Sequence, residues 1–400
     1  MRFAIIGTGF VADYYMTTLA NHPGLDLAGV WDRDDARLAQ FCAHWNVPAF
    51  GSQAALLADE TVETVAVLTN PESHFEIGMA VLGAGKHLYC EKPLAMSFDD
   101  ARTLAGMAGK AGLVLAGAPA NARSDAFALM QSTLNAGAIG APKLVYAEME
   151  DGPVFRLNWR DWRSVSGAPW PGAHEFRIGC TLEHAGYALT WLIGLFGPVR
   201  RITGQSGTFF FDKGAGIPAN EMAPDFSCAL LEFDNGVMAR LTSGLAAPRD
   251  RALTVMGETG TLTVADLWDN RAAIHLEAAG KKAAFGHRIV RRLERQLGRP
   301  LPLRLAAGRR LAYRAPANRS HLPAYPSQID FCAGIAAIAD WETCLPVLQR
   351  LAALLETGAL DAWLTPIIMK RGRPAQALHA LVQVDQVDEQ AQRILGLTGS

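Results

Sequence analysis

A glycine pattern near the start of the chain constrains its fold more than any other feature. Gly7-Thr8-Gly9-Phe10-Val11-Ala12 follows the apolar run Phe3–Ile6 and precedes a segment with helical character. Gly7 permits a tight turn, Gly9 lets a ligand approach the backbone, and Ala12 is small enough for close helix–strand packing. A strand, a glycine turn and a helix in this order predict the first unit of a doubly wound α/β sheet.

The alternation of strand and helix continues through residues 1–120. Further strands are expected at Leu25–Trp31, Val62–Leu68, Gly85–Cys90 and Leu113–Leu115, with helical segments between them. Such alternation favours parallel strands joined by right-handed crossovers. The sequence therefore predicts an N-terminal Rossmann domain over residues 1–120.

Extended runs replace this alternation after residue 120. The expected strands are Lys143–Glu150, Arg201–Phe211, Asp225–Glu232, Gly236–Ser243, Arg251–Met256 and Gly260–Val264. One helix, Cys180–Phe196, interrupts them, and helical character returns at Ile329–Asp340 and Cys344–Thr357. The pattern predicts an α+β domain over 121–370 with an open, mainly antiparallel sheet, followed by a tail over 371–400.

Composition narrows the class of protein. The net charge of −2 gives no global reason to expect nucleic-acid binding. The six cysteines form no C-x-x-C pair, so we expect free thiols, no metal site and a cytoplasmic location. The apolar start is too short for a secretory leader, and no run is long enough to cross a membrane.

One local segment is strongly basic. Residues 281–320 hold twelve Lys or Arg and one acid, and 285–297 has the pattern of a basic amphipathic helix. Contact with an anionic membrane surface is one interpretation. A helix packed on the protein with its basic face in water is the interpretation we favour, and no motif for reading nucleic acid accompanies the charge.

A carboxylate follows the second expected strand. Asp32 lies 23 residues after Gly9, where it can accept both ribose hydroxyls of an adenosine. The same charge would repel a 2′-phosphate, so the cofactor predicted is NAD. Arg33 weakens this discrimination because a guanidinium can contact a 2′-phosphate, and NADP stays an alternative.

Two more breaks fall at the carboxyl ends of expected parallel strands, where such sheets bind ligands. Thr69-Asn70-Pro71 closes the third strand, and Glu91-Lys92-Pro93 closes the fourth. Pro93 disfavours helical geometry at Lys92, which can then point toward a nicotinamide ring. The predicted cofactor-binding residues are Gly7, Thr8, Gly9, Phe10, Val11, Asp32, Arg33, Thr69, Asn70, His74, Glu91 and Lys92.

These motifs, in this order, resemble the Gfo/Idh/MocA family of oxidoreductases (glucose–fructose oxidoreductase and inositol dehydrogenase). The resemblance covers nearly the whole chain and is most specific in residues 1–120. It implies a Rossmann domain followed by an open sheet that often mediates homo-oligomers, here a dimer or tetramer. It also implies NAD(P)-dependent chemistry on sugars or cyclitols, with Lys92 catalytic and Glu91 positioning it.

The helix between the domains departs from that family's Asp-x-Gly-x-His-x-x-Asp pattern. Glu183 takes the first acid position, Tyr187 the histidine position and Thr190 the last acid position. Glu183 and Tyr187 are four residues apart, so they share one helix face, and His184 borders it. Tyr187 could act as acid/base if Lys92 lowered its pKa; His184 is the alternative, and the expected catalytic residues are Lys92, Tyr187, His184 and Glu183.

The segment 156–177 is dense in tryptophan and arginine. Flat aromatic faces suit a polyol or sugar, and guanidinium groups suit a carboxylate or phosphate. A purely structural loop or an oligomer contact is the alternative. The residues expected to contact substrate are Arg123, Trp159, Arg160, Trp162, Arg163 and Trp170.

The sequence thus predicts an NAD(P)-dependent oxidoreductase that moves hydride between nicotinamide and a hydroxyl-bearing carbon of a sugar, cyclitol or sugar derivative. Two alternatives stay open. One is a non-redox NAD-binding regulator or assembly protein, and the other is a hydrolase or lyase that uses NAD transiently.

Overall fold

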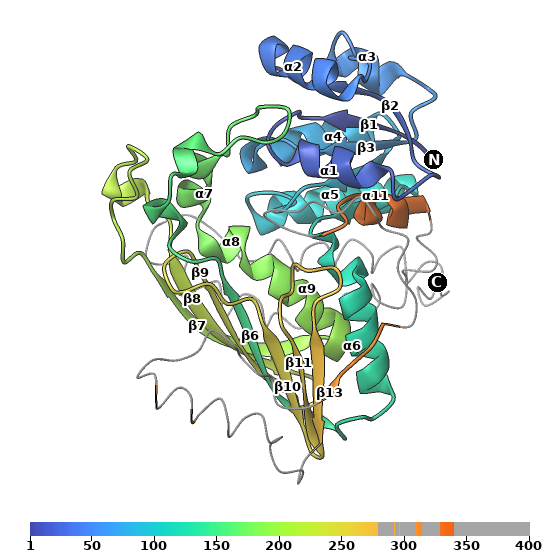
Figure 1. Ribbon diagram of the computed structural model, residues 1–400. Helices are drawn as coiled ribbons and strands as arrows, with labels where there is room; N and C mark the ends of the chain where they lie inside the picture. The colour runs from blue at the N-terminus through green and yellow to red at the C-terminus, as the bar shows by residue number, and fades with distance from the viewer. Residues whose placement is uncertain (279–291, 293–295, 297–308, 314–328, 340–400) are drawn as a thin grey trace.

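The computed structural model describes residues 1–278, 292, 296, 309–313 and 329–339, which form two sheets with their helices (Figure 1). Of the basic segment 281–320, only 292, 296 and 309–313 belong to the described residues. The hypothesis of a basic helix over 285–297, the expected helix at Cys344–Thr357 and the predicted tail 371–400 therefore lie outside what the structure describes.

The N-terminal sheet has five parallel strands in the order β2-β1-β3-β4-β5. The strands are β1 (Arg2–Ile6), β2 (Asp26–Trp31), β3 (Thr64–Val67), β4 (His87–Cys90) and β5 (Leu115–Gly117). The helices are α1 (Ala12–Leu19), α2 (Asp35–Trp45), α3 (Gln53–Ala58), α4 (His74–Gly83) and α5 (Phe98–Ala111), with a 3-10 turn, η1, at Pro71–Ser73. The doubly wound prediction is confirmed. The strand order changes direction between β1 and β3, so the connections that leave these two strands run to opposite sides, and a crevice lies beyond their carboxyl ends.

Gly7 shows why the first turn needs glycine. Its φ is +101°, and a Cβ there would lie 2.8 Å from the Leu68 backbone. The turn after β1 therefore packs directly against the chain leaving β3. Side-chain caps begin two of the helices. The Asp34 side chain accepts a hydrogen bond from the Arg37 amide at the start of α2, and the Ser97 side chain accepts one from the Asp100 amide at the start of α5.

The second sheet has eight strands in the order β13-β12-β11-β10-β6-β9-β8-β7. They are β6 (Pro142–Glu150), β7 (Val199–Gly207), β8 (Phe226–Phe233), β9 (Met238–Gly244), β10 (Leu253–Gly257), β11 (Gly260–Val264), β12 (Ile274–Ala278) and β13 (Arg309–Arg310). Its ladders are antiparallel except for β6 with β9, which are parallel. The predicted open, mainly antiparallel sheet is confirmed. The sequence did not predict β12, where only Ile274 is buried and the alternation is correspondingly weak.

Helices cover one face of this sheet. They are α6 (Asp125–Asn135), α7 (Gly172–Ile178), α8 (Cys180–Glu183) and α9 (Ala185–Phe196), with 3-10 turns η2 (Ala120–Arg123), η3 (Val154–Arg156), η4 (Trp159–Asp161) and η5 (Ala219–Glu221). The prediction of one continuous helix over Cys180–Phe196 is wrong at a single residue. His184 has φ −119° and ψ −40°, which separates α8 from α9.

The last described helix, α11 (Cys332–Ala339), packs against the N-terminal domain, beside α1 (Figure 1). The Cys332 amide donates to Thr18 Oγ1 at 3.1 Å, and a Cβ on Gly334 would meet the Tyr89 ring. The helix was expected at Ile329–Asp340, but within a second domain over 121–370. Its contacts join it instead to the first sheet, because its apolar surface completes that sheet's core.

The outer face of the second sheet exposes apolar side chains. Leu144 and Tyr146 on β6 and Leu230 on β8 are each more than two-fifths exposed. The homo-oligomer expected through this sheet stays a prediction. Within the described part of the chain, the cysteines are unpaired, no cluster of potential metal ligands occurs, and no helix has the length and apolarity to span a bilayer.

Candidate active site

A cleft of about 1150 Å³ lies between the two domains and combines most of the predicted site residues. Its N-terminal wall comes from the turn after β1, the chain after β3 and the Glu91-Lys92 turn after β4. Its other wall comes from Asp151, the segment 154–175, α8 and α9, and the loops between β9 and β10 and between β11 and β12. The predicted residues on it are Gly7, Gly9, Phe10, Val11, Asp32, Arg33, Thr69, Asn70, Glu91, Lys92, Trp162, Arg163, Trp170, Glu183, His184 and Tyr187.

The glycine turn leaves room for a ligand. A Cβ added to Gly9 would meet nothing within 4 Å, although Gly9 lines the cleft. The backbone there is open to a close-lying phosphate at the start of α1. The residues present therefore fit a dinucleotide.

Asp32 is held by its neighbours. It accepts hydrogen bonds from the Thr8 amide at 2.7 Å and the Asp34 amide at 2.9 Å, and Arg37 Nη2 lies 2.6 Å away. Burial alone would raise the pKa of Asp32, but the hydrogen bonds from Arg37 and Thr8 outweigh it and hold the pKa below its usual range. Thr8 itself is fully buried, so it holds Asp32 instead of lining the cleft.

Lys92 is anchored as a cation. It forms an ion pair with Glu183, and its Nζ lies 5.9 Å from the centre of the Tyr187 ring. Burial opposes the charge on Lys92, but Glu183, with smaller contributions from Glu175 and Glu91, outweighs burial and raises the pKa of Lys92. The two side chains that the sequence placed on one helix face thus both contact Lys92, despite the break at His184.

Glu91 fixes the turn that carries Lys92. It is 6% exposed, accepts a hydrogen bond from the Tyr15 hydroxyl at 2.6 Å, and accepts another from the Lys92 amide at 3.1 Å. Tyr15 belongs to α1, so the first helix holds the Glu91-Lys92 turn in place.

His184 is trapped between two carboxylates. Its Nε2 pairs with Glu175 and its Nδ1 with Asp151. Burial would lower the pKa of His184, but the two carboxylates outweigh it and raise the pKa to about 10. The same contact helps to lower the pKa of Asp151 to about 2 against the effect of burial. His184 is therefore a cation between two carboxylates, an arrangement that disfavours proton acceptance by its ring, and its role as the acid/base stays a prediction.

Tyr187 stays a neutral phenol. The sequence hypothesis required Lys92 to lower its pKa. Burial instead outweighs the opposing charge of Lys92 and raises the pKa of Tyr187. In this state Tyr187 can donate a proton at neutral pH but cannot accept one.

Besides Thr8, four predicted contact residues lie away from the cleft surface. The His74 ring is buried, with Nδ1 2.6 Å from the Pro93 carbonyl oxygen and Nε2 2.9 Å from that of Thr69. His74 therefore joins two of the ligand-facing turns from behind. Trp159, Arg160 and Arg123 are also outside the cleft lining.

Aromatic packing explains the position of Trp159 and Arg160. The Trp159 ring lies edge-on to Phe176, with 5.4 Å between ring centres, in a small second core. The Arg160 guanidinium lies 4.7 Å from the Trp159 ring centre, on the outside of that core. Arg123 is an exposed residue at the end of η2.

Several cleft residues were not anticipated from the sequence: Arg37, Asp151, Glu175, Arg249, Arg251 and Trp268. Most contribute through partners distant in the chain. Arg251, for example, pairs with Asp151 and stacks on Trp268 with 3.3 Å between its guanidinium carbon and the ring centre.

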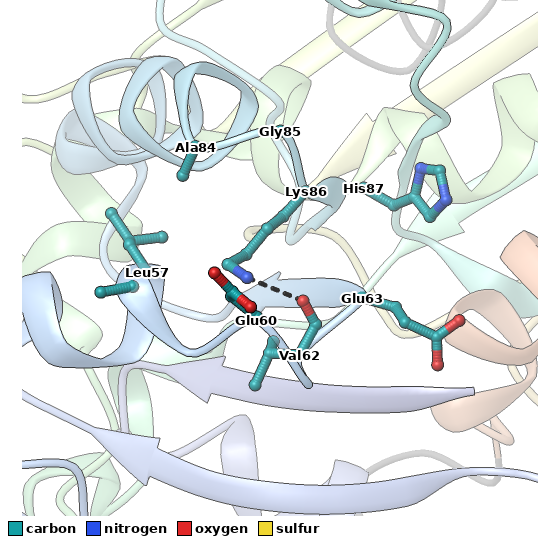
Figure 2. Close-up of a pocket in the computed structure, with 9 residues that line it drawn as sticks. Leu57, Glu60, Val62, Glu63, Ala84, Gly85, Lys86 and His87 are labelled. Carbon is teal, nitrogen blue, oxygen red and sulfur yellow. Dashed lines mark hydrogen bonds between the residues drawn. The ribbon is translucent and has the colours of Figure 1, made fainter.

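A second, smaller hollow lies at the opposite end of the N-terminal sheet. There Lys86 donates to the carbonyl oxygens of Val62 at 2.8 Å (Figure 2) and Asp59 at 2.7 Å. These bonds satisfy a buried lysine at the amino ends of β3 and β4. The hollow is thus a structural feature, far from the carboxyl-end site.

A glycine turn, an anchored lysine and an inter-domain cleft that charged side chains line define the class of protein as a nucleotide-dependent oxidoreductase. Family models agree: residues 1–118 match the oxidoreductase family, NAD-binding Rossmann fold, and residues 127–263 match the Gfo/Idh/MocA C-terminal domain. The chain belongs to the Gfo/Idh/MocA family of NAD(P)-dependent oxidoreductases acting on hydroxyl groups. Residues 346–400 match a model described as nickel insertion protein, and they lie outside the described residues.

Relatives of the chain are named as dehydrogenases of hydroxyl-bearing compounds. Trans-1,2-dihydrobenzene-1,2-diol dehydrogenase from Mus musculus is 23% identical over 288 residues, which cover 71% of this chain and 80% of that enzyme. UDP-N-acetylglucosamine 3-dehydrogenase from Acidithiobacillus ferrooxidans is 35% identical over 116 residues, 29% of this chain and 36% of that enzyme.

Solved structures share the fold. That of the Acidithiobacillus ferrooxidans enzyme has a TM-score of 0.61 at 18% identity, covering 98% of this chain and 96% of its own. The structure of the WlbA dehydrogenase from Bordetella pertussis, in complex with NADH and UDP-GlcNAcA, has a TM-score of 0.56 at 19% identity. The match covers 74% of this chain and 82% of that enzyme's chain.

Proposed function

We propose that the protein transfers hydride between the nicotinamide of bound NAD(P) and a hydroxyl-bearing carbon of a sugar, cyclitol or sugar derivative. The observation that supports this most directly is the position of Lys92. It is held as a cation by Glu183, beside Tyr187, in the cleft that begins at the glycine turn.

The chain's own residues would hold the dinucleotide along one wall of the cleft. Gly7, Gly9, Phe10 and Val11 offer the pyrophosphate a backbone turn and the start of α1, and Asp32 lies at the ribose end. When bound, the nicotinamide supplies the hydride acceptor or donor. Thr69, Asn70 and Lys92 line the cleft toward its reactive end.

Proton chemistry falls to Lys92 and Tyr187. The Lys92 cation stabilises negative charge on the substrate oxygen. Tyr187, a neutral phenol, donates a proton to that oxygen when a carbonyl is reduced. Glu183 orients Lys92, and His184 keeps Asp151 and Glu175 charged without taking part in proton transfer.

These protonation states suit carbonyl reduction as they stand. Oxidation of an alcohol requires Tyr187 to lose its proton first, and burial opposes that loss. The rate of oxidation should therefore rise with pH more steeply than the rate of reduction.

The test separates cofactor binding from turnover. Calorimetry with NAD, NADH, NADP and NADPH measures binding, and a panel of polyols, sugars and their keto forms measures turnover. Lys92→Met should retain cofactor affinity and lose at least about a hundredfold in kcat, and Tyr187→Phe should behave similarly. Lys110→Met, an exposed lysine at the end of α5, is the matched control and should leave both unchanged.

Three results would contradict the proposal. Failure to bind any of the four nucleotides removes its basis. Tight NAD binding without turnover on any substrate, unaffected by Lys92→Met in cells, would instead favour a regulator or assembly protein. Products formed without net change in NADH would favour a hydrolase or lyase that uses NAD transiently.

A further inference from the structure

Three side chains with hydrogen-bond donors meet on the second-domain wall of the cleft: Arg249, Arg251 and Trp268. Arg251 is 6% exposed, and its Nε and Nη2 both face Asp151. Its remaining terminal nitrogen, Nη1, is buried and has no hydrogen-bond partner among the described residues. One end of a buried guanidinium is thus left unsatisfied beside the cleft.

Trp268 presents a second unsatisfied donor on the same wall. Its indole Nε1 is buried and has no hydrogen-bond partner within the described part of the chain. Its ring stacks on the Arg251 guanidinium, so the two residues form one unit. Buried polar groups in folded proteins nearly always have partners, and an exception calls for a missing group. Two such exceptions on adjacent, cleft-lining residues indicate a ligand.

The donor set indicates what kind of ligand group is missing. Guanidinium and indole groups only donate hydrogen bonds. The nearest carboxylate, Asp151, is already paired with Arg251 and His184. A hydroxyl placed here would face the donors of Arg251 and Trp268, and its own hydrogen would compete for carboxylates that are already paired. A carboxylate or phosphate only accepts, and guanidinium groups bind both of these well.

Arg249 adds a second positive charge at the open edge of this unit. Its side chain is 51% exposed, and its Nη2 lies 3.1 Å from Asp266. Two of the three arginines that the sequence analysis assigned to the substrate have partners within their own segment. Arg160 stacks on Trp159, and Arg163 donates to the carbonyl oxygens of Arg160 and Trp162.

We infer that the substrate is an anionic sugar derivative whose carboxylate or phosphate binds Arg251, Trp268 Nε1 and Arg249, while its reacting carbon faces Lys92 and Tyr187. This inference rests on the function proposed above. The spacing is that of one small molecule, because the ring centres of Trp268 and Tyr187 are 4.7 Å apart. The anion and the reacting hydroxyl would thus belong to the same sugar unit or to directly linked groups.

The test uses the full-length protein saturated with NADH, so that the pyrophosphate site is filled. Sodium phosphate and sodium acetate are added separately up to about 50 mM, with sodium chloride adjusted to keep the ionic strength constant. The melting temperature measures binding of each anion. We expect a saturable increase with at least one anion, and the one that binds more tightly identifies phosphate or carboxylate as the natural group.

Matched variants locate the site. Arg249→Gln and Trp268→Phe should each weaken anion binding about fivefold to tenfold, because each removes donors and leaves Arg251 paired with Asp151. Trp268→Phe retains an aromatic ring under the guanidinium. Arg251→Gln should abolish the effect, and the other two variants keep the test valid if it fails to fold. Arg200→Gln, which removes an exposed arginine on β7, should bind the anions like the unmodified protein.

The inference would be overturned if neither anion raised the melting temperature, or if Arg249→Gln and Trp268→Phe kept the full effect. NADH affinity is measured in the same samples. If the protein binds NADH and turns over neutral polyols but binds neither anion, the inference of an anionic substrate is wrong and the oxidoreductase proposal stands. Failure to bind NADH would remove the oxidoreductase proposal itself.

Discussion

Lys92 and Glu183 form an ion pair across the boundary between the two domains. Lys92 belongs to the turn after β4, and Glu183 is the last residue of α8. Both side chains are largely buried, at 18% and 8% exposed. Removing one partner of a buried pair leaves the other charge uncompensated, which is the costly case. Lys92, which we propose to be catalytic, therefore depends on the second domain for its charge.

We expect Glu183→Gln to lower kcat about tenfold to a hundredfold and to leave cofactor affinity nearly unchanged. Without Glu183 the pKa of Lys92 falls, because burial is then opposed only by more distant carboxylates. The alkaline limb of the pH–rate profile should shift to lower pH. Steady-state kinetics between about pH 6 and pH 10 test this, with Glu232→Gln on β8 as a remote control. An unchanged profile would show that Glu183 does not hold the charge of Lys92.

Asp32 carries the predicted preference for NAD. Hydrogen bonds from Thr8 and Arg37 keep its carboxylate charged, so a 2′-phosphate would be repelled. We expect Asp32→Ser to improve the ratio of kcat/KM for NADP to that for NAD by about tenfold or more, because Arg33 and Arg37 then face the ribose unopposed. Asp35→Ser, at the start of α2, removes a nearby exposed carboxylate and should not change the ratio. If Asp32→Ser kept the original preference between NAD and NADP, residues other than Asp32 would set that preference.

The parts of the site that could be predicted from the sequence are those set by local pattern. A strand, a glycine turn and a helix fix where Gly9 lies, and Pro93 fixes the turn at Lys92. The spacing of Glu183 and Tyr187 placed both near the lysine even though the helix breaks at His184. Short-range geometry was sufficient for these positions.

The rest depends on contacts between distant segments. The two carboxylates that pair with His184 come from other segments of the chain. Asp151 directly follows β6, and Glu175 lies on α7. No periodicity connects those three positions. The same holds for Arg251, whose role follows from its position between Asp151 and Trp268, and for α11, whose apolar residues gave no indication of which sheet they would cover.

The segment 159–171 bridges the cleft and is attached to the first domain next to the glycine turn. Ser166 donates from its hydroxyl to Asp13 at 2.7 Å, and Asp13 is a buried residue in the first turn of α1. Trp162, Arg163 and Pro169 of this segment line the cleft opposite Gly9. We expect a dinucleotide bound to the turn to lie under this segment, so that its release requires the Ser166–Asp13 bond to open.

We therefore expect Ser166→Ala to speed NADH release about tenfold, because a hydrogen bond to a charged group contributes about 1.5–3 kcal/mol and the Ser166 amide bond to Asp13 remains. Stopped-flow fluorescence of bound NADH measures the rate. Ser132→Ala, an exposed serine on α6, is the control. Equal release rates in all three proteins would show that this attachment does not limit exit of the cofactor.

Glu150 makes stability depend on pH. It is 4% exposed, and neither carboxylate oxygen has a hydrogen-bond partner among the described residues. Burial, reinforced by Glu148, raises its pKa to about 7. An unfolded glutamate ionises near the ordinary pKa of about 4.3, so above that value the folded state must either hold an extra proton or bury a charge.

The folded protein should consequently lose stability as the pH rises from about 4.5 to about 7, by on the order of 1–3 kcal/mol, and the loss should level off at higher pH. Glu150→Gln cannot ionise and should lack this component. Urea titration at several pH values measures the free energy of unfolding of both proteins. Over that interval the stability of the variant should rise relative to that of the unmodified protein. Glu60→Gln, an exposed glutamate, should show no such change. A difference that is constant with pH would mean that Glu150 titrates alike in the folded and unfolded chains.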